Sequence, residues 1–453
     1  MRMRSIFAGF LVLGVAACDD VLTVEPTNEV PDEIAIRDAN SARAALAGAY
    51  DGLQDLSYYG GDLVLFGDLL SDNAIHTGTF TGFIEADDNL LRANNSTVED
   101  IWDALYIAIG RTNDLIIRLP DVSGLSDEEK SEMLGQAHFL RALSYHNAVK
   151  LWGAPPSVVG GDGVPIRLEP PATANDASQI SRDPTSAVYQ QILDDLAQAE
   201  ALMTTETGPY DASLGAVHAL RSRVFLYLSQ WADVITEADA VEALGYELAS
   251  SFPQLFTEEG SVTDEDIFRV SFTAVEFNNL GFYYFSRSFG GRREQAPSAG
   301  LDATYEAGDE REAWSISFDG SGRRYGSKFP TTAGAEDIHV IRFAEVLLNR
   351  AEAHARLNQL ASAVADYNRV RVRAGLAPHV LGVHVTTQQQ VIDAVLNERR
   401  LELAMEGDRW SDLVRTGMAV AVMGLADRPH QVLLPIPQNE LDIAPNLVQN
   451  PGY

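Results

Sequence analysis

Two helical segments joined by only two residues place the strongest constraint on the fold of this chain. In "IHVIRFAEVLLNRAEAHARL" (338–357) apolar side chains recur three and four residues apart, from Ile341 and Ala344 to Ala355. The next segment (360–374) repeats this spacing, which is that of one face of an α-helix. Because the link is "NQ", the two helices must pack antiparallel, and their small Ala residues let the axes approach closely.

The same periodicity recurs along most of the chain. Further helices are predicted over residues 34–56, 98–119, 132–153, 185–203, 213–229, 231–243 and 388–406. The helices on either side of "SQW" (229–231) form a second hairpin. Both hairpins resemble tetratricopeptide-type units, although the period of that repeat is not regular here. The sequence therefore predicts a mainly α fold with helical hairpins as its scaffold.

Three polar stretches that are rich in Gly and Pro interrupt the helical pattern, at residues 57–97, 154–184 and about 250–337. The last is too long for a plain loop. Its clusters of aromatic and β-branched residues predict an inserted, irregular and loop-rich subdomain with a few short strands. Loops held by a rigid scaffold are where binding surfaces usually lie, so the function is expected there.

The charge of the chain limits its partners. The 453 residues include 33 Lys and Arg against 65 Asp and Glu, a formal net charge of −32. So acidic a chain repels phosphate backbones and anionic membrane surfaces, which makes nucleic acid an unsuitable partner. A hydrophobic share of 46% is enough for a packed core. One Cys excludes an internal disulfide framework and any multi-cysteine metal site.

The N-terminus has the layout of a secretory signal peptide. "MRMRSIFAGFLVLGVAA" (1–17) has a basic start, an apolar run and then small residues. The run is too short to span a bilayer as a mature helix, and no other segment is long and apolar enough to do so. Residues 18–33, with two Pro and many acids, are predicted to be a tether.

The single cysteine, Cys18, stands directly after this segment. "Val15-Ala16-Ala17-Cys18" resembles a bacterial lipobox, in which the thiol receives a diacylglycerol and the signal is cut before the Cys. Two or three acyl chains anchor a protein essentially permanently. An ordinary signal peptide with a chance Cys, or a catalytic thiol, are the alternatives. Asp19 and Asp20 resemble a surface-export signal.

No catalytic or metal-binding motif is present in the sequence. The nine His residues show no HExxH or similar spacing, and those within predicted helices are expected to be structural: His138, His146, His218 and His354. Acidic pairs such as Asp87-Asp88 or Asp264/Asp266 could serve a glycosidase, but they are expected by chance in so acidic a chain. There is also no G-x-S-x-G elbow and no P-loop. The sequence predicts no catalytic residue, no metal and no cofactor.

The densest charges occur in "NERRLELAMEGDRWSDLVRTG" (397–417). Glu398 and Glu402 are one helical turn apart, with two Arg beside Glu398. Gly407 is predicted to break the helix, and Asp408 to cap the next short one. We expect a buried ion-pair network that fixes this corner, in preference to an active site.

At these residues the sequence resembles the SusD/RagB family of surface nutrient-binding lipoproteins. Six segments carry the resemblance in the family's order: "GQAHFLRALSYHNAVKLWGAPP" (135–156), "VYQQILDDLAQAEALM" (188–203), "IRFAEVLLNRAEAHARLN" (341–358), "DYNRVRVRAGL" (366–376), "ERRLELAMEGDRWSDLVRTG" (398–417) and "LLPIPQNELDIAPNLVQNPGY" (433–453). They run from the first long helices to the last residue. The combination is specific to this family.

The resemblance implies a single α-helical domain over residues 34–453, with tetratricopeptide-like hairpins and an irregular insertion. It implies a lipoprotein of the outer membrane, anchored only by its N-terminal lipid and exposed at the cell surface. Such proteins cap a SusC-like TonB-dependent barrel. They capture an oligosaccharide, or sometimes a peptide, and pass it into the barrel without catalysis.

Sugar recognition needs flat aromatic faces with hydrogen-bonding side chains around them. In this family loops carry the ligand site, and the candidate stretches here are 57–61, 76–83, 278–291 and the surroundings of Trp314. The candidate ligand-binding residues are Phe80, Phe83, Asn94, Tyr283, Tyr284, Arg287 and Trp314. Each could equally be packed inside the irregular subdomain. The other four Trp are expected in the core: Trp102, Trp152, Trp231 and Trp410.

Two other functions remain open at this point. A surface-anchored glycoside hydrolase would release reducing ends from polysaccharide. A tetratricopeptide-like adaptor would bind a protein in place of a nutrient.

Overall fold

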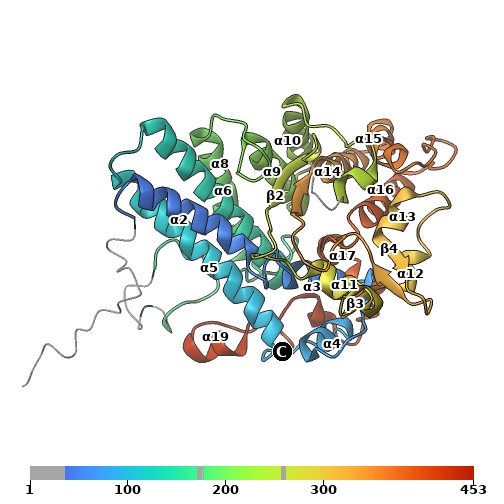
Figure 1. Cartoon of the computed structure of the whole chain (residues 1–453), viewed down its shortest axis with the longest axis horizontal. Helices are drawn as coiled ribbons and strands as arrows, with labels where there is room; N and C mark the ends of the chain where they lie inside the picture. Colours follow the sequence, from blue (N-terminus) through green and yellow to red (C-terminus); the bar gives the residue numbers. More distant parts are fainter. Residues whose placement is uncertain (1–35, 171–175, 177, 257–261) are drawn as a thin grey trace, which may run out of the picture.

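The computed structural model describes residues 36–170, 176, 178–256 and 262–453 (Figure 1). The first long helices of the chain lie on one side of the molecule in this view, and the short helices and strands of the insertion lie on the other, beside the long helices of residues 343–402 (Figure 1). The predicted signal peptide, the tether and Cys18 lie outside the described residues.

In the described part of the chain, nine longer helices form the scaffold. They are α2 (Ala39–Asp51), α5 (Ser96–Arg118), α6 (Asp127–Trp152), α8 (Thr185–Leu202), α9 (Leu214–Tyr227), α10 (Trp231–Ala243), α14 (Phe343–Arg356), α15 (Leu360–Arg373) and α16 (Gln388–Glu402). Neighbours in the chain pack on one another: α5 on α6, α6 on α8, α9 on α10, and α14 on α15. α10 also packs on α14, which joins the two predicted hairpins. The prediction of a mainly α fold with helical hairpins is confirmed.

The link between α14 and α15 has the tight geometry that its length demands. Asn358 adopts a φ of 59°, a left-handed conformation that Asn tolerates better than most residues. Ala344, Ala351, Ala355 and Ala363 are completely buried where the two helices meet their neighbours. Their small side chains allow the close approach of the helix axes.

The prediction of a helix over residues 338–357 was wrong at its start. Ile338–Arg342 forms strand β6, and α14 begins only at Phe343. β6 pairs antiparallel with β2 (Asp266–Val270), and every residue of both strands is buried. A short apolar run that is buried on both faces has no alternation to reveal it, so periodicity does not separate it from a helix. Its β-branched residues favour the strand.

Short elements occupy the first and the last of the interrupted stretches and the C-terminal part. Residues 52–88 hold η2 (Gly52–Gln54), α3 (Asp62–Leu69), β1 (Ala74–His76) and α4 (Thr81–Asp87). Residues 250–337 hold η4 (Phe252–Phe256), β2, α11 (Leu280–Tyr284), η5 (Arg287–Phe289), β3 (Gln295–Pro297), α12 (Ala299–Asp302), α13 (Glu310–Ser315), β4 (Ile316–Phe318) and β5 (Arg324–Gly326). Elsewhere are η3 (Leu119–Asp121), α17 (Arg409–Arg415), α18 (Ala419–Val422), η6 (Pro429–Val432) and α19 (Gln438–Ile443).

The strands of residues 250–337 confirm the prediction of a few short strands, and β2 and β3 pair with strands outside that stretch. Among the described residues there are three two-stranded antiparallel sheets, β1–β3, β2–β6 and β4–β5. β2 pairs with a strand next to scaffold helix α14, and β3 pairs with β1 from the first interrupted stretch. The insertion is therefore tied into the scaffold by backbone hydrogen bonds.

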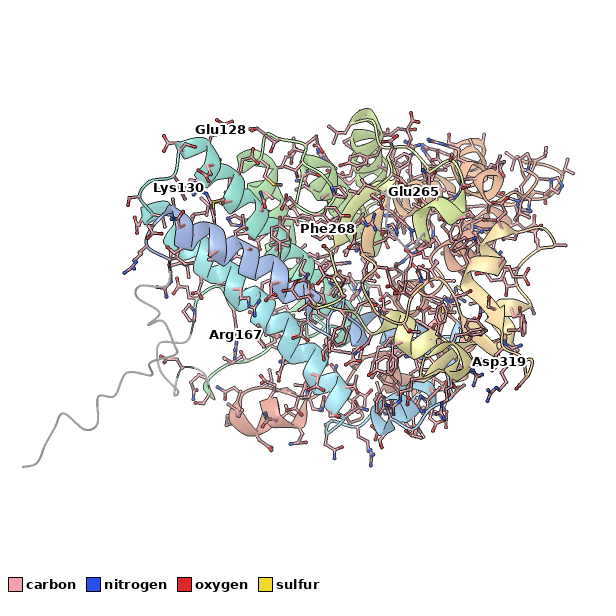
Figure 2. All side chains as sticks on the ribbon, in the orientation of Figure 1. Glu128, Lys130, Arg167, Glu265, Phe268 and Asp319 are labelled. Carbon is pink, nitrogen blue, oxygen red and sulfur yellow. The ribbon has the colours of Figure 1, made fainter. Side chains whose placement is uncertain are left out.

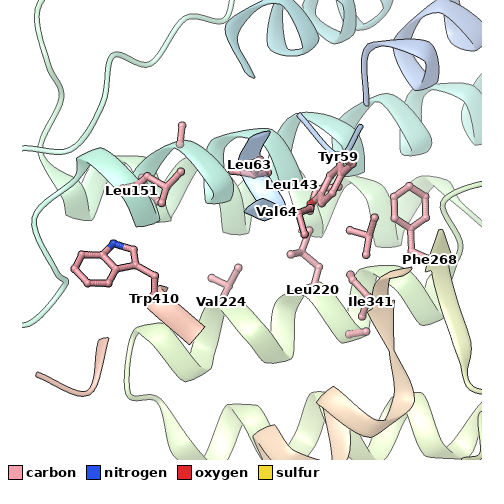
Figure 3. Close-up of a cluster of buried hydrophobic side chains, with 14 of the residues drawn as sticks. Tyr59, Leu63, Val64, Leu143, Leu151, Leu220, Val224, Phe268, Ile341 and Trp410 are labelled. Carbon is pink, nitrogen blue, oxygen red and sulfur yellow. The ribbon is translucent and has the colours of Figure 1, made fainter. Parts of the chain in front are cut away.

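One large cluster of buried hydrophobic side chains joins the scaffold to β2, β6 and α17. Figure 3 shows its centre, where Phe268 of β2 and Ile341 of β6 lie near Leu220 of α9. Trp410 of α17 belongs to the same cluster. Full burial of such a side chain contributes about 1.5–3 kcal/mol, so this core holds the loop-bearing part firmly on the helices.

The helical histidines have the structural roles that the sequence predicts. His138 of α6 lies 2.7 Å (Nδ1 to Oδ1) from Asp195 of α8. His218 of α9 lies 2.7 Å (Nδ1 to Oε2) from Glu237 of α10. His146 is completely buried, and burial lowers its pKa well below the ordinary value. His354 contacts the side chain of Gln359 across the α14–α15 link. These rings fasten one helix to the next.

The predicted ion-pair network at residues 397–417 is confirmed. Its centre is Glu402, whose side chain is completely buried and pairs with Arg311, Arg342 and Arg373. The buried members of the set, which we call the corner network, are Glu265, Asp309, Arg311, Lys328, Arg342, Arg371, Arg373, Glu398, Glu402 and Glu406. Arg371 also pairs with Glu306, which is half-exposed at its edge. Five cations face five carboxylates in a nearly water-free interior. Because charges without partners are very costly there, the network holds the insertion to α15 and α16.

Gly407 does not break the helix as predicted, because α16 already ends at Glu402; it lies in the turn before α17 for another reason. Its φ is 85°, and a Cβ there would come within 2.9 Å of the Val64 backbone. Gly67 of α3 lies directly against the Gly407 carbonyl, so neither position has room for a side chain. The two glycines let α3 pack on the turn before α17.

The prediction that Asp408 caps α17 was wrong, because its side chain makes no capping hydrogen bond. Asp408 lies instead near Glu345, Arg223 and Lys150. Burial, and then the negative charge of Glu345, raises the pKa of Asp408 to about 6. Its carboxylate takes part in a second set of buried charges beside the corner network.

Candidate ligand-binding site

The β1–β3 sheet brings together two loops that are about two hundred residues apart in the sequence. Its register pairs Ala74 with Pro297 and His76 with Gln295. The pairing continues beyond the strands, where the Thr77 N–H donates to the Glu294 carbonyl oxygen at 2.8 Å. The Thr77 hydroxyl donates to the Arg293 carbonyl oxygen at 2.6 Å. Residues 77–83 are thereby held against residues 280–294.

Three aromatic rings meet at this junction. The ring centroids of Phe80 and Phe83 are 5.7 Å apart, those of Phe80 and Tyr283 5.9 Å, and those of Phe83 and Tyr283 6.0 Å. All three pairs are edge-to-face, with interplanar angles of 85° to 89°. This is a favoured geometry for aromatic pairs. Phe80 and Tyr283 are half-buried, so they retain surface for a ligand.

A buried carboxylate, Glu294, fixes the loop beneath these rings. It accepts hydrogen bonds from the backbone N–H groups of Thr79 (2.7 Å) and Phe80 (2.9 Å) and from Nε of Arg292 (2.7 Å). Burial opposes its ionisation, but these donors outweigh burial and hold the pKa of Glu294 below its ordinary value. Gly78 lies so close to this carboxylate that a Cβ would collide with it. The loop is therefore pre-formed around a charged anchor.

Arg292 completes the platform. Its guanidinium carbon lies 3.9 Å from the centroid of the Phe80 ring, within the range of a cation–π interaction. The same side chain is held by Glu294, so its orientation is set from below. The guanidinium covers one face of the Phe80 ring, so a ligand at that face would meet the fixed guanidinium stacked on the ring.

Two of the predicted ligand-binding residues are buried. Phe83 is 2% exposed and is covered by Phe66 and His76 in addition to the rings above. Tyr284 is 1% exposed and stacks on Phe329. Neither ring has a face open to a ligand in this structure, so their visible role is to support Phe80 and Tyr283.

The other candidates lie at different distances from this junction. Arg287 is exposed in η5, where its Nε donates to the Arg292 carbonyl oxygen at 3.2 Å. Asn94 is exposed in the turn before α5, and its neighbour Asn95 donates to the Gly82 carbonyl oxygen. Both are therefore near the ends of the two loops.

Trp314 belongs to a separate cluster. It is half-buried on α13 and packs against the side chains of Ala249, Phe252, Leu255 and Phe256. Among the other tryptophans expected in the core, Trp102, Trp152 and Trp410 are buried and Trp231 is half-buried. The structure thus groups Phe80, Phe83 and Tyr283, whereas Tyr284 stacks on Phe329 and Trp314 lies in a separate cluster.

Several residues of the site escape prediction from the sequence. Arg292 and Glu294 follow the pair of glycines in "FGGRRE", a pattern typical of any flexible loop. A second aromatic group lies nearby, in which Phe285 and Phe289 contact Tyr325 with centroids 5.4 Å and 5.5 Å apart. Phe289 is 54% exposed. In the sequence, the only signal that could have indicated this group is the aromatic residue Phe289 itself.

One surface groove lies away from the aromatic junction. It holds about 550 Å³ between α2 and residues 269–276 and is lined by Tyr50, Tyr210 and Glu276 among others. A smaller groove of about 280 Å³ lies beside α5, with Asp103, Tyr106 and Glu440. Burial, and then the charge of Glu440, raises the pKa of Asp103 to about 6. Neither groove contains a residue that the sequence predicts to bind the ligand.

In the part of the chain that the structure describes, no group of three or more His, Cys, Asp or Glu side chains could hold a metal ion. None of the helices in those ranges is long and apolar enough to cross a membrane.

The fold and this surface define a class of protein: a tetratricopeptide-like helical scaffold whose inserted loops carry a rigid aromatic platform. Two family models match the chain. One, described as "SusD family", matches residues 324–432, and the other, described as "Starch-binding associating with outer membrane", matches residues 26–226. The chain belongs to the SusD-like family.

Curated relatives agree with this assignment. "SusD-like protein P38" of Formosa agariphila is 28% identical, and the match covers 100% of both chains. "Starch-binding protein SusD" of Bacteroides thetaiotaomicron is 36% identical over a shorter stretch, 26% of this chain and 22% of that protein.

Solved structures share the fold. A "Laminarin binding SusD-like protein" has a TM-score of 0.80 and 25% identity, and the match covers 92% of this chain and 100% of that one. A "Putative sugar binding protein" of Bacteroides vulgatus has the same TM-score and identity, with 92% and 99% covered. The tetratricopeptide-like architecture is that of these SusD-superfamily proteins.

Proposed function

We propose that this chain is a cell-surface lipoprotein that binds an oligosaccharide and delivers it to a SusC-like TonB-dependent outer-membrane barrel. The observation that carries the binding part is the likeness to the laminarin-binding SusD-like protein, which extends over all of that protein. A peptide ligand is the alternative that the family resemblance allows. The outer membrane is the location that the description of the second family model supports.

The geometry of the aromatic junction supports a sugar ligand. A sugar ring packs its C–H surface on an aromatic face and needs hydrogen-bond donors at its edge. Phe80 and Tyr283 supply partly exposed rings, and Arg292 supplies N–H donors beside Phe80. Glu294 holds this arrangement in place before any ligand arrives. Pre-organisation of this kind reduces the entropy that binding must overcome.

The anchor and the delivery step rest on the sequence. Lipidation at Cys18 would place the first mature residue in the outer membrane, and residues 18–33 would tether the folded part above it. The folded part, which carries a large net negative charge, would then contact the membrane only through this lipid. The barrel is the partner that the family resemblance implies.

The binding part is tested by affinity electrophoresis of the full chain, purified in detergent, through gels that contain one polysaccharide each. Retardation by at least one polysaccharide is expected, and laminarin and starch are the first to include. A chain that migrates unchanged through a broad panel, and that also binds no peptide from a mixed library, would contradict the proposal.

The hydrolase alternative is tested on the same samples. We propose binding without catalysis, so no reducing ends should appear when the protein is incubated with a polysaccharide that retards it. Release that Asp103→Asn abolishes would assign catalysis to the groove beside α5. That result would replace the proposed function with a surface-anchored glycoside hydrolase.

The delivery part is tested by affinity purification of the tagged chain from its own outer membrane. Co-purification of a large TonB-dependent barrel is expected. Recovery of a different protein in stoichiometric amount, with no barrel, would favour the adaptor alternative.

A further inference from the structure

Four arginines gather on the insertion next to the aromatic junction. Arg287 lies in η5, Arg293 follows Arg292 in the same loop, and Arg323 and Arg324 lie at the start of β5. Arg287, Arg323 and Arg324 are all close enough to Arg293 to act on its charge. Burial, and then repulsion from Arg323, lowers the pKa of Arg293 from its ordinary value. We call these four residues the arginine patch.

Two members of the patch have no carboxylate partner within the described ranges of the chain. Arg287 donates from Nε to the Arg292 carbonyl oxygen at 3.2 Å. Arg293 donates from Nε to the Arg324 carbonyl oxygen at 2.8 Å. These bonds position each guanidinium but do not neutralise it. The terminal N–H groups of both side chains remain available for a ligand.

The carboxylates that do face the patch are already occupied. Asp319 pairs with Arg323 at 2.9 Å and accepts from the backbone N–H of Ser321 at 2.8 Å. It also accepts from the Ser286 hydroxyl at 3.1 Å, so it holds the two loops together. Asp302 pairs with Arg324 at 3.3 Å. The patch therefore has four positive charges against two negative ones, in a chain whose net charge is −32.

Exposed aromatic rings accompany these charges. Phe289 is 54% exposed and contacts Tyr325, and Phe318 is 53% exposed. Phe318 lies directly opposite Arg324 in the β4–β5 pair. The label of Asp319 in Figure 2 marks this end of the molecule, on the insertion and far from α2. Flat apolar faces beside unpaired guanidinium groups form a surface for a ring that also carries negative charge.

We propose that the arginine patch selects oligosaccharides that carry anionic groups on their sugar rings. The inference rests on the proposed function and adds the chemical class of the ligand. The planar guanidinium matches the paired oxygens of a carboxylate or a sulfate ester and binds them through two parallel hydrogen bonds. A chain with so much negative charge repels a polyanion at long range, so a local positive surface is needed to hold one.

The test uses the full chain in detergent and three probes: oligogalacturonate for carboxylate, carrageenan oligosaccharides for sulfate, and laminarin oligosaccharides as the neutral case. Affinity is measured by calorimetry at low and at moderate salt. We expect at least one anionic probe to bind about tenfold or more tightly than the neutral one, with an affinity that falls as salt screens the charges. The anionic probe that binds shows whether the ligand's charge comes from carboxylate or from sulfate groups.

The variant that tests the patch is Arg287→Gln/Arg293→Gln, because it removes the two guanidinium groups that lack carboxylate partners. It should lose tenfold or more in affinity for the anionic probe. The matched control is Arg37→Gln/Arg43→Gln, which removes the same charge from exposed positions at the start of the chain's described part. The control should bind like the parent chain.

The outcomes separate this inference from the proposed function. Equal affinity for neutral and anionic probes, unchanged in the Arg287→Gln/Arg293→Gln variant, would overturn the inference and leave sugar binding intact. Equal losses in that variant and in the control would also overturn it, because net charge alone would explain them. Binding of none of the three probes, together with no retardation in the polysaccharide panel, would contradict the proposed function itself.

Discussion

The corner network and the arginine patch use the same side chain in opposite ways. In the corner network Arg311 and Arg342 are almost completely buried, and each meets two or more carboxylates. In the arginine patch Arg287 and Arg293 reach solvent and donate to backbone carbonyl oxygens. The first group has matched charges and the second does not.

This difference separates structural charge from functional charge. An interior cannot hold an unmatched ion, so every buried arginine of the corner network must have its carboxylates, and the group is part of the fold. At the surface water tolerates an unmatched ion, and surface pairs contribute little to stability. Unmatched exposed charge therefore costs the fold little and is free to act on a ligand. Each variant below tests one side of this contrast.

The largest effect is expected from Glu402→Gln. The change keeps the shape of the side chain but leaves Arg311, Arg342 and Arg373 with one fewer buried carboxylate. Loss of one partner of a buried pair typically costs about 3–5 kcal/mol of unfolding free energy. Urea unfolding followed by circular dichroism measures it.

The control for that variant is Glu129→Gln, which removes the partner of Arg43 from an exposed pair on α6. Its loss of unfolding free energy should be much smaller, because exposed ion pairs contribute little to stability. Equal losses in the two variants would mean that burial does not distinguish these ion pairs, and the contrast would fail.

Acid should weaken the fold through the buried carboxylates. Burial opposes ionisation of Glu406 and Asp412, but Arg342 and Arg399 respectively outweigh it and lower each pKa to about 2. Because the folded values lie below the unfolded ones, the stabilisation is complete above about pH 5 and is lost as the pH falls towards 2. Each group accounts for about 2–3 kcal/mol.

Unfolding free energies at pH 7, 5, 4 and 3 measure this loss. Asp408 acts with the opposite sign, because its raised pKa makes the folded state bind a proton more readily than the unfolded state near pH 5. Asp408→Asn should therefore steepen the net loss between pH 7 and pH 4. A parent chain that is equally stable at pH 7 and pH 3 would contradict the importance of the corner network.

The smallest effect on stability is expected from Arg287→Gln/Arg293→Gln. Neither side chain has a carboxylate partner among the described residues, so the unfolding free energy should change by less than about 0.5 kcal/mol. Because the variant removes mutual repulsion within the arginine patch, we expect a slight gain in unfolding free energy and not a loss. A loss of several kcal/mol would place the arginine patch in the fold, together with the corner network.

Periodicity predicts the scaffold well because its helices are long and bury one face. It fails at Ile338–Arg342, where a five-residue strand is buried on both faces and shows no alternation. The ion-pair network around Glu402 is also predictable. The charged residues of "ERR" and "EG" lie too close together near the end of the helix for all of them to face solvent. Asp408 shows the limit of that reasoning, because a residue suited to capping serves a buried charge cluster.

The site is less predictable, because a sequence does not reveal which distant loops meet. The sequence predicts Phe80 and Tyr283 as ligand-binding residues on two separate loops. Only the β1–β3 pairing shows that the two rings meet. The same pairing buries Phe83, which no local pattern distinguishes from Phe80. Glu294 is one of 65 acidic residues in the sequence, and only its three donors in the structure identify it as the anchor of the loop.

The central claim is that the aromatic junction binds the sugar, and one titration tests it most directly. The full chain, Phe80→Ala and Phe277→Ala are titrated calorimetrically with the oligosaccharide of a polysaccharide that retards the parent chain. Phe277 is the control because it is 45% exposed and lies at a groove near α5. If the aromatic junction binds the sugar, Phe80→Ala should lose about tenfold in affinity for the oligosaccharide, or about 1.4 kcal/mol, and Phe277→Ala should not change. Unchanged affinity in Phe80→Ala, with a loss in Phe277→Ala, would move the site to that groove and contradict the account.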